Sequence, residues 1–461
     1  MNTIDVGEVI DNSRLSRLQV LVLVMCGICM IIDGFDVQAM GYVAPAIIQQ
    51  WGINKSDLGP VFGAGLIGMA VGAPLAGILA DRLGRRLILI IALIGLSAGM
   101  AATATADTVR DLLVLRFLAG FCMGAIVPNA MAMAGEFSPL RNRVTLVMLT
   151  SCGFVVGGAL GGTLAVMMIE PLGWQSVFLV GAAAPLLLAV LMLIIMPESI
   201  QFLVLRQRKL DRVRGWLRRI DGALHLQPDT RLQVRDAPVG KRSSLLDLVR
   251  DSRGLGTAML WIILFMNLLG AYFLASWLPV IMHDAGHDTS SAVLAGTLLW
   301  TGGIIGNLVL GWFVDRRGFG PVMVCMFAVA AVAIAVLGQV ATSMVSATIV
   351  IAIAGFCVLG GQSALNALAT VFYPATMRST GAGWALGVGR LGSIVGPVIG
   401  GELMRLGWTS QSLLLAASLP AFLALLASLV FWFQGGLPRP VLRSRSLDAV
   451  TPASLTKVQR S

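Results

Sequence analysis

The sequence predicts an all-α integral membrane protein with twelve transmembrane helices in two pseudo-symmetric six-helix bundles. Three observations support this prediction: the composition, the number of apolar segments and a repeat between the two halves of the chain. Of the 461 residues, 57% are hydrophobic and 12% are Asp, Glu, Lys or Arg. Soluble proteins carry about a quarter charged residues. Too little polar surface therefore remains for a soluble enzyme, a secreted disulfide scaffold or a DNA-binding domain.

The second observation is the set of long apolar segments. A helix needs about 20 apolar residues to cross a bilayer, and the sequence contains twelve such segments, at residues 18–43, 57–80, 87–106, 111–135, 144–168, 174–196, 256–282, 291–314, 320–341, 345–371, 380–404 and 409–433. A polar stretch separates two groups of six. The predicted domains are an N-terminus (1–17), a first bundle (18–196), a central loop (197–255), a second bundle (256–433) and a tail (434–461).

Basic residues predict the orientation of these helices. One set of loops, which includes both termini and the central loop, holds 28 of the 33 Lys and Arg. The opposite loops hold Lys55, Arg110 and Arg405. Because loops rich in Lys and Arg stay in the cytoplasm, we expect both termini and the central loop there. The net charge of +10 then follows from topology and contact with anionic lipid, and we expect no nucleic-acid partner.

The third observation is an internal repeat. The segment Gly77–Arg86 (GILADRLGRR) follows the second span, and the related segment Gly311–Gly318 (GWFVDRRG) follows the eighth, 234 residues later. A proline and an arginine after the fourth span recur after the tenth at an offset of 235: Pro139 and Arg143, then Pro374 and Arg378. Two motifs at one offset indicate a duplication. Paired bundles of this kind usually hold a binding site between them at the membrane midplane, exposed alternately to each side.

These motifs resemble the major facilitator superfamily over nearly the whole chain, from about Leu18 to Phe433. Three further segments resemble its aromatic acid:proton symporter family: Asp33–Asp36 (DGFD), Pro197–Ser199 (PES) and Gly389–Ser393 (GRLGS). The resemblance implies a transporter that imports 4-hydroxybenzoate, protocatechuate, gallate, benzoate or a related carboxylate into bacteria. It also implies that Arg116, in the segment LLVLRFLAG, takes part in proton coupling.

Two departures from related patterns bear on the substrate. Sugar porters continue Pro-Glu-Ser with Pro-Arg, whereas Ile200-Gln201 follows here, which argues against a sugar. Drug:proton antiporters carry GxxxGPxxGG in the fifth span. The equivalent segment here, Gly153–Gly162, lacks the proline, and the full pattern occurs instead at Gly392–Gly401 in the eleventh span. We favour import.

Charged residues within spans are costly and usually functional. Asp33 and Asp36 are three residues apart in the first span and therefore lie on one helical face, one turn apart. Burial and mutual repulsion both disfavour two ionised carboxylates, so this pair is a candidate proton carrier. A carboxylate satisfied by a structural arginine or a helix end is the alternative interpretation.

Two arginines also lie within spans. Arg390 lies near the middle of the eleventh span, where it is placed to offer a bidentate contact to a substrate carboxylate. Its alternative role is a structural ion pair. Arg116 lies at a depth comparable to Asp36, so we expect the two to pair, with proton or substrate binding breaking the pair. Snorkelling of Arg116 to the membrane surface is its alternative.

Other residues are candidates for the gate and the substrate pocket. We group Glu136, at the end of the fourth span, with the proton-coupling residues and expect it to act at the cytoplasmic mouth through Arg82 or Arg141. The predicted gate residues, which the resemblance supports more than spacing does, are Gly77, Asp81, Arg82, Gly84, Arg85, Arg86, Asp315 and Arg316. The predicted pocket residues beyond Arg390 and Asp36 are Gln362, Asn366, Tyr272 and Trp277, with Trp300 as a further candidate for stacking on an aromatic ring. Aromatic residues also pack helices or line membrane interfaces.

The sequence thus predicts a proton-coupled importer of aromatic carboxylates in the bacterial inner membrane, functional as a monomer, with no cofactor beyond the coupling proton and no metal. The six cysteines lie inside apolar segments without a metal-binding pattern. Two alternatives share the fold: a symporter of a non-aromatic organic acid, and a drug or metabolite:proton antiporter. A membrane receptor, which would bind aromatic acids without transporting them, is an alternative from a different class. A membrane enzyme is disfavoured, because the sequence shows no set of catalytic residues.

Overall fold

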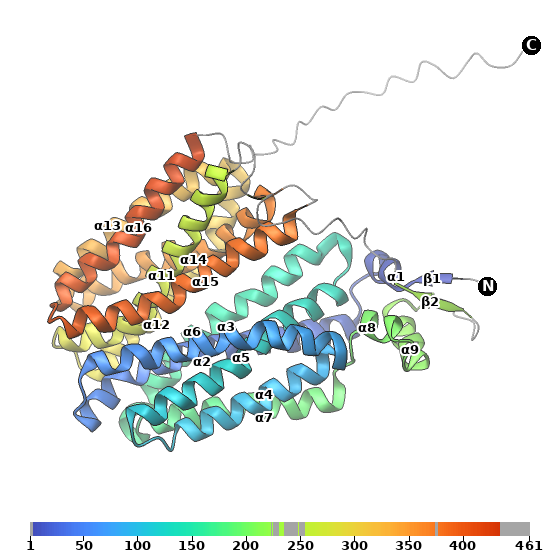
Figure 1. The fold of residues 1–461 in the computed structure, drawn as a ribbon, viewed down its shortest axis with the longest axis horizontal. Coiled ribbons are helices and arrows are strands. Elements are labelled where there is room, and N and C mark those ends of the chain that lie inside the picture. The colour runs from blue at the N-terminus through green and yellow to red at the C-terminus, as the bar shows by residue number, and fades with distance from the viewer. Residues whose placement is uncertain are drawn as a thin grey trace, which may run out of the picture.

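A computed structural model describes residues 3–222, 224, 230–234, 248, 254–373 and 377–433, with the side chains of 378 and 379 left undescribed. It is a bundle of long helices (Figure 1). Twelve of the described helices are long and apolar enough to cross a membrane, which confirms the predicted fold class. Pro374, parts of the central loop (223, 225–229, 235–247 and 249–253) and the tail at 434–461 lie outside the described residues.

The first half of the chain supplies six long helices: α2 (Arg17–Trp51), α3 (Leu58–Leu83), α4 (Arg85–Thr103), α5 (Val109–Phe137), α6 (Arg143–Leu172) and α7 (Gln175–Ile195). The second half supplies α11 (Gly254–Asp284), α12 (Thr289–Arg317), α13 (Phe319–Val340), α14 (Met344–Phe372), α15 (Arg378–Arg405) and α16 (Ser410–Phe433). Seven of these helices extend beyond their predicted apolar segments at both ends: α2, α5, α6, α11, α12, α14 and α15. In contrast, α7 lies within its predicted segment, and α4 ends three residues earlier than predicted. Short 3₁₀ helices η1 (Lys55–Asp57) and η2 (Leu140–Asn142) precede α3 and α6.

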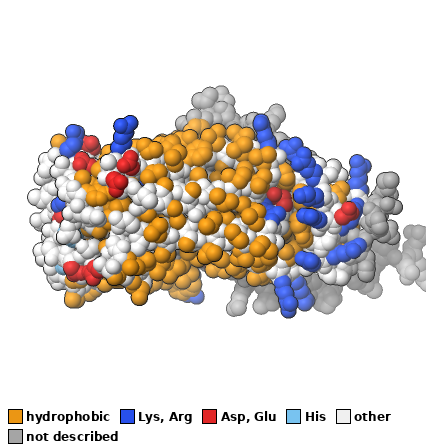
Figure 2. Space-filling view, turned by 90° about the horizontal axis from the view of Figure 1, so that it is seen from below, with side chains coloured by type: hydrophobic (Ala, Val, Ile, Leu, Met, Phe, Trp, Pro, Cys, Tyr) orange, Lys and Arg blue, Asp and Glu red, His pale blue; other side chains and the backbone are white. Residues whose placement is uncertain are grey.

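A small polar subdomain lies at one end of the first half, where β1, α1, β2, α8 and α9 gather (Figure 1). Strand β1 (Thr3–Asp5) pairs in parallel with β2 (Arg231–Gln233). The short helices are α1 (Val6–Asn12), α8 (Ile200–Leu205) and α9 (Leu210–Ile220). Asp11 of α1 forms an ion pair with Arg143 at the start of α6. We call the end of the molecule where this subdomain lies the basic end, because Lys and Arg cluster there beside the apolar belt (Figure 2).

The internal repeat is visible in the turns and in the helix packing. Gly84, after α3, and Gly318, after α12, both have a positive φ, of 103° and 80°, a conformation that residues with a Cβ rarely adopt. Gly120 on α5 lies against the backbone of Gly65 on α3, and Gly355 on α14 lies against the backbone of Leu299 on α12. A Cβ at either glycine would overlap that backbone. The duplication therefore preserves both the turn and the close helix contact.

The two halves are joined at the far end, opposite the basic end. Lys55 Nζ lies 2.6 Å from Asp284 Oδ1, and the Ser290 hydroxyl donates to Glu170 Oε1 at 2.6 Å. Nearer the middle, the Gln38 side chain on α2 donates to the carbonyl of Ala275 on α11 at 2.6 Å. These contacts close the far end in this conformation.

Candidate functional site

A buried ion pair joins α2 to α5 in the first half. Arg116 Nη1 lies 2.7 Å from Asp36 Oδ1, and Nη2 lies 3.0 Å from Oδ2 and 3.1 Å from the Asp36 carbonyl oxygen. Asp36 is 0% and Arg116 4% exposed. The arginine also lies over the Phe178 ring, 5.9 Å from its centroid. The predicted pairing is therefore present, and it is bidentate, which is a strong geometry for a buried pair.

Asp33 lies one turn from Asp36 toward the basic end, and its environment is different. It is 1% exposed, and its Oδ1 atom has no hydrogen-bond partner among the described residues. Arg390 of α15 and Tyr272 of α11 lie within electrostatic range of it. An unpaired carboxylate is costly to bury. Asp33 therefore gains stability by holding a proton or by approaching a cation, and Arg390 is the nearby cation from the other half.

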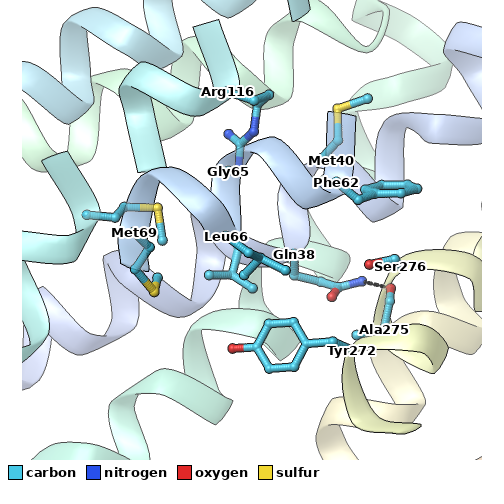
Figure 3. A pocket seen from close by; sticks show the side chains of 12 residues that line it. Gln38, Met40, Phe62, Gly65, Leu66, Met69, Arg116, Tyr272, Ala275 and Ser276 are labelled. Carbon is cyan, nitrogen blue, oxygen red and sulfur yellow. Dashed lines mark hydrogen bonds between the residues drawn. The ribbon is translucent and has the colours of Figure 1, made fainter. Parts of the chain in front are cut away.

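A narrow cavity lies between the halves beside these charges (Figure 3). Its walls come from α2, α3, α5 and α11, and they include Gln38, Leu66, Met69, Arg116 and Tyr272. Its volume is about 20 Å³, enough for about one water molecule. In Figure 3 the Tyr272 ring and the Gln38 amide both extend into the space between the helices.

A larger cavity lies next to the narrow one and shares two wall residues with it, Leu66 and Met69. Its volume is about 380 Å³, within the range of small-molecule sites. Arg390 lines this cavity and is exposed in it, with Nη1 2.9 Å from the Met69 sulfur. The remaining walls are apolar residues of α3, α5 and α15 together with Ser393. This arrangement places a guanidinium in an apolar chamber, as a small organic anion requires.

A chain of amides crosses the second half between α11 and α14. Asn267 Nδ2 donates to Gln362 Oε1 at 2.7 Å, and Gln362 Nε2 donates to Asn366 Oδ1 at 2.9 Å. The two predicted amides therefore share one helix face, as expected. Asn267 did not emerge from the sequence reasoning, although a signal existed: it lies 234 residues after Asp33, the offset of the repeat. Its buried Oδ1 has no partner among the described residues.

Trp277 and Trp300 have packing roles in this conformation. The Trp277 indole is fully buried, donates to the Pro397 carbonyl at 2.8 Å and contacts the Phe62 ring edge-on. Trp300 packs edge-on against Phe154 of α6. Neither tryptophan is among the residues that line the two cavities described above. Tyr272 is thus the predicted aromatic residue that reaches the site.

The expected partners of Glu136 were wrong. Its carboxylate pairs with Arg85, not with Arg82 or Arg141, and it accepts a hydrogen bond from the Ser199 hydroxyl at 2.5 Å. Arg82 and Arg141 are exposed instead. Side-chain direction accounts for the difference, because Arg85 is the first residue of α4 and faces inward after the Gly84 turn.

Glu198, in the PES segment, is a second acidic residue beside Glu136 and Arg85 at the basic end. Glu198 Oε1 accepts a hydrogen bond from the Arg86 backbone amide at 2.9 Å, and the Arg86 guanidinium donates to the Leu193 carbonyl at 2.6 Å. The cluster therefore ties the turn after α3 to the end of α7. It stabilises the basic end of the first half.

The other predicted gate residues lie apart from the cluster of Arg85, Glu136 and Glu198. Asp81 and Asp315 are exposed, and among the described residues neither forms an ion pair with the opposite half. The Asp81 carbonyl accepts a hydrogen bond from Arg206 at 3.2 Å, and the Arg316 guanidinium lies 4.0 Å above the Trp312 ring. An added Cβ at Gly77 or Gly311 would meet no atom within 4 Å. The basic end is thus not held closed by these residues in this conformation.

Twelve apolar helices in two repeated halves, with buried charges and a chamber between them, define a multi-pass membrane transporter. The chain belongs to the Major Facilitator Superfamily, whose model matches residues 26–385 and, in an overlapping second match, 260–459. It is a transporter and not an enzyme, as its named relatives indicate.

Two relatives span almost the same length as this chain. The gallate transporter of Pseudomonas putida is 38% identical over 426 residues, 92% of this chain and 94% of the relative. The 4-hydroxybenzoate transporter PcaK of Pseudomonas putida is 39% identical over 428 residues, 93% and 96% of the two chains. Among solved structures, a bacterial homologue of the human lysosomal transporter Spinster, inward-facing and unoccupied, superposes with a TM-score of 0.71 at 15% identity, over 91% of this chain and 99% of that one. The superfamily inferred from the motifs is confirmed.

Proposed function

We propose that this protein imports an aromatic carboxylate together with one or more protons across the bacterial inner membrane. The observation that carries the proposal is Asp33, a buried carboxyl whose Oδ1 atom has no hydrogen-bond partner in the described part of the chain. It lies within electrostatic range of Arg390 from the other half. The names of the relatives, a gallate and a 4-hydroxybenzoate transporter, support the aromatic substrate class.

The orientation follows from the basic loops. The basic end holds the loops with most of the Lys and Arg, so it faces the cytoplasm. Both termini then lie in the cytoplasm and the far end faces outward. A conformation joined at the far end is accordingly closed to the outside. The protein acts as a monomer, because each chain contains both halves of the site.

The charge of the substrate sets the energetic problem. The inside-negative membrane potential opposes entry of one anionic charge by about 2.3 kcal/mol per 100 mV. One proton per monoanion makes the cycle electroneutral, so the pH gradient alone drives it, with roughly tenfold accumulation per pH unit. A second proton would use the potential as well, and two carboxyls one turn apart permit that stoichiometry.

The cycle begins with the site open to the outside and Asp33 protonated, so that Arg390 is free to bind the substrate carboxylate. Tyr272 packs against the ring, and the Gln362–Asn366 amides hydrogen-bond its substituents. Neutralising both charges lowers the cost of a dry, closed site, and the halves then rock so that the basic end opens. Release of substrate returns Arg390 to Asp33, and the arginine displaces its proton to the cytoplasm.

Substrate affinity tests the role of Arg390. We expect Arg390→Gln to weaken binding of the aromatic acid by about 10- to 100-fold, because a hydrogen bond to a charged group contributes roughly 1.5–3 kcal/mol. Arg390→Lys keeps the charge but loses the bidentate geometry, so its loss should be intermediate. Equilibrium binding of radiolabelled acid to purified protein measures both. Arg405→Gln, at the exposed end of the same helix, is the control, and equal affinity in Arg390→Gln and wild type would contradict the assignment.

A transport panel tests the function itself. Proteoliposomes with an imposed inward proton gradient are offered labelled benzoate, 4-hydroxybenzoate, protocatechuate, gallate and vanillate at two pH values. We expect the gradient to drive accumulation of at least one of these acids. Accumulation of none of these acids would contradict the proposed substrate class, and gradient-driven export of them would assign the protein to the antiporters.

A further inference from the structure

An apolar groove runs along the second half between α12, α13 and α14, away from the transport site. One part has a volume of about 700 Å³, and its exposed walls include Ile305, Phe313, Cys325 and Val329. A second part, of about 440 Å³, shares the wall residues Val329 and Ile353 with the first, so the two parts lie next to each other along α13. Helix α13 packs against α12, α14 and α16 of its own half. The groove therefore opens on the membrane-facing side.

One cationic side chain lies at the end of this groove. Arg317, the last residue of α12, lines the larger part and is exposed. Among the described residues it has no ion-pair or hydrogen-bond partner. Its neighbour Arg316 is held over the Trp312 ring. The groove thus combines apolar walls with an unpaired guanidinium at its basic end.

The dimensions match those of a membrane lipid. Along α13 the groove walls run from Pro321 to Val336, a helical rise of about 22 Å. The hydrocarbon of one leaflet is about 15 Å thick, half of the roughly 30 Å core. An acyl chain therefore fits along the groove while a headgroup stays at the end where Arg317 lies.

We propose that this groove is a binding site for one anionic phospholipid, with an acyl chain along α13 and the headgroup phosphate at Arg317. Charge complementarity selects the occupant. A zwitterionic phospholipid would fill the apolar walls equally well, but the cation of its headgroup offsets the phosphate charge next to the guanidinium, whereas an anionic phospholipid keeps a net negative charge there. The proposal is independent of the transported substrate, because none of the groove residues belongs to the site between the halves.

Native mass spectrometry of the purified full-length protein tests the proposal with two probes of identical acyl chains, phosphatidylglycerol and phosphatidylcholine. We expect one phosphatidylglycerol per protein to be retained in preference to phosphatidylcholine. Arg317→Gln should reduce that preference by about fivefold, the effect of one basic residue near anionic lipid. Val329→Trp fills the groove and should abolish retention of both lipids.

Two control variants locate the effect. Arg208→Gln removes another exposed basic residue at the same end, and Leu415→Trp introduces the same tryptophan side chain on the exposed face of α16. Both should bind lipid like the wild type. Equal retention of the two lipids by the wild type would identify an unspecific apolar crevice and overturn the proposal. An unchanged preference in Arg317→Gln would overturn it as well, and so would a wild-type dimer that Val329→Trp dissociates, because a second copy would then occupy the groove.

Discussion

Proteoliposomes carrying Asp33→Asn are expected to lose gradient-driven uptake completely while still exchanging substrate across the membrane. Asparagine preserves the size of the side chain but cannot take up or release a proton. Accumulation should therefore fall from roughly tenfold per pH unit to none. Counterflow needs no net proton movement, so exchange of labelled for unlabelled acid should persist. Uptake with and without a pH gradient, together with counterflow, measures both properties in one preparation.

The matched control for this experiment is Asp57→Asn, at the exposed last residue of η1, just before α3. It should accumulate substrate like the wild type. Loss of counterflow as well as uptake in Asp33→Asn would indicate a damaged site and not a lost proton carrier. Wild-type accumulation in Asp33→Asn would remove Asp33 from the coupling mechanism.

Removing one partner of the buried pair is expected to have the largest effect on stability. Arg116→Gln leaves the Asp36 carboxylate buried without its cation, and the loss of one partner from such a pair costs about 3–5 kcal/mol. The purified variant should therefore unfold at a clearly lower temperature than the wild type. Thermal unfolding in detergent, followed by loss of the monodisperse peak in size-exclusion chromatography, measures this change.

The double variant Asp36→Asn/Arg116→Gln separates the lost charge pair from simple loss of packing. It removes the uncompensated carboxylate and should be more stable than Arg116→Gln alone. Arg110→Gln, at the exposed start of α5, controls for loss of an arginine on the same helix. If the single and double variants unfolded at the same temperature, the pair would have no coupling energy and the interpretation of its geometry would be wrong.

Most of the fold could be predicted because two strong constraints act on the sequence. The length of apolar sequence needed to cross a bilayer defines the membrane-spanning helices, as α2 to α7 and α11 to α16 show. The internal repeat defines which helices of the two halves are equivalent. The Gly84 and Gly318 turns occupy equivalent positions in the motif. The small subdomain of β1, β2, α1, α8 and α9 was not predicted, because its elements are short and polar and its strands pair across more than 220 residues.

Contacts in the site could be predicted for charged residues whose depth in the membrane leaves few possible counter-charges. Asp36 and Arg116 lie at similar depth, and a buried charge must find its counter-charge nearby. Near a helix end this argument loses force, because several arginines reach the same carboxylate. Glu136 therefore binds Arg85 and not the expected Arg82 or Arg141. Asn267 has no charge to attract notice, and only its equivalence to Asp33 in the repeat would have identified it.

Direct observation of proton movement is the sharpest test of the coupling that we propose for Asp33. The aromatic acid with the highest uptake is added to weakly buffered proteoliposomes without a pH gradient, and the external pH is recorded. A symporter should make the external medium more alkaline as substrate enters, and Asp33→Asn should produce no such change. Acidification of the medium, or substrate entry by the wild type at constant pH, would contradict proton symport through this site.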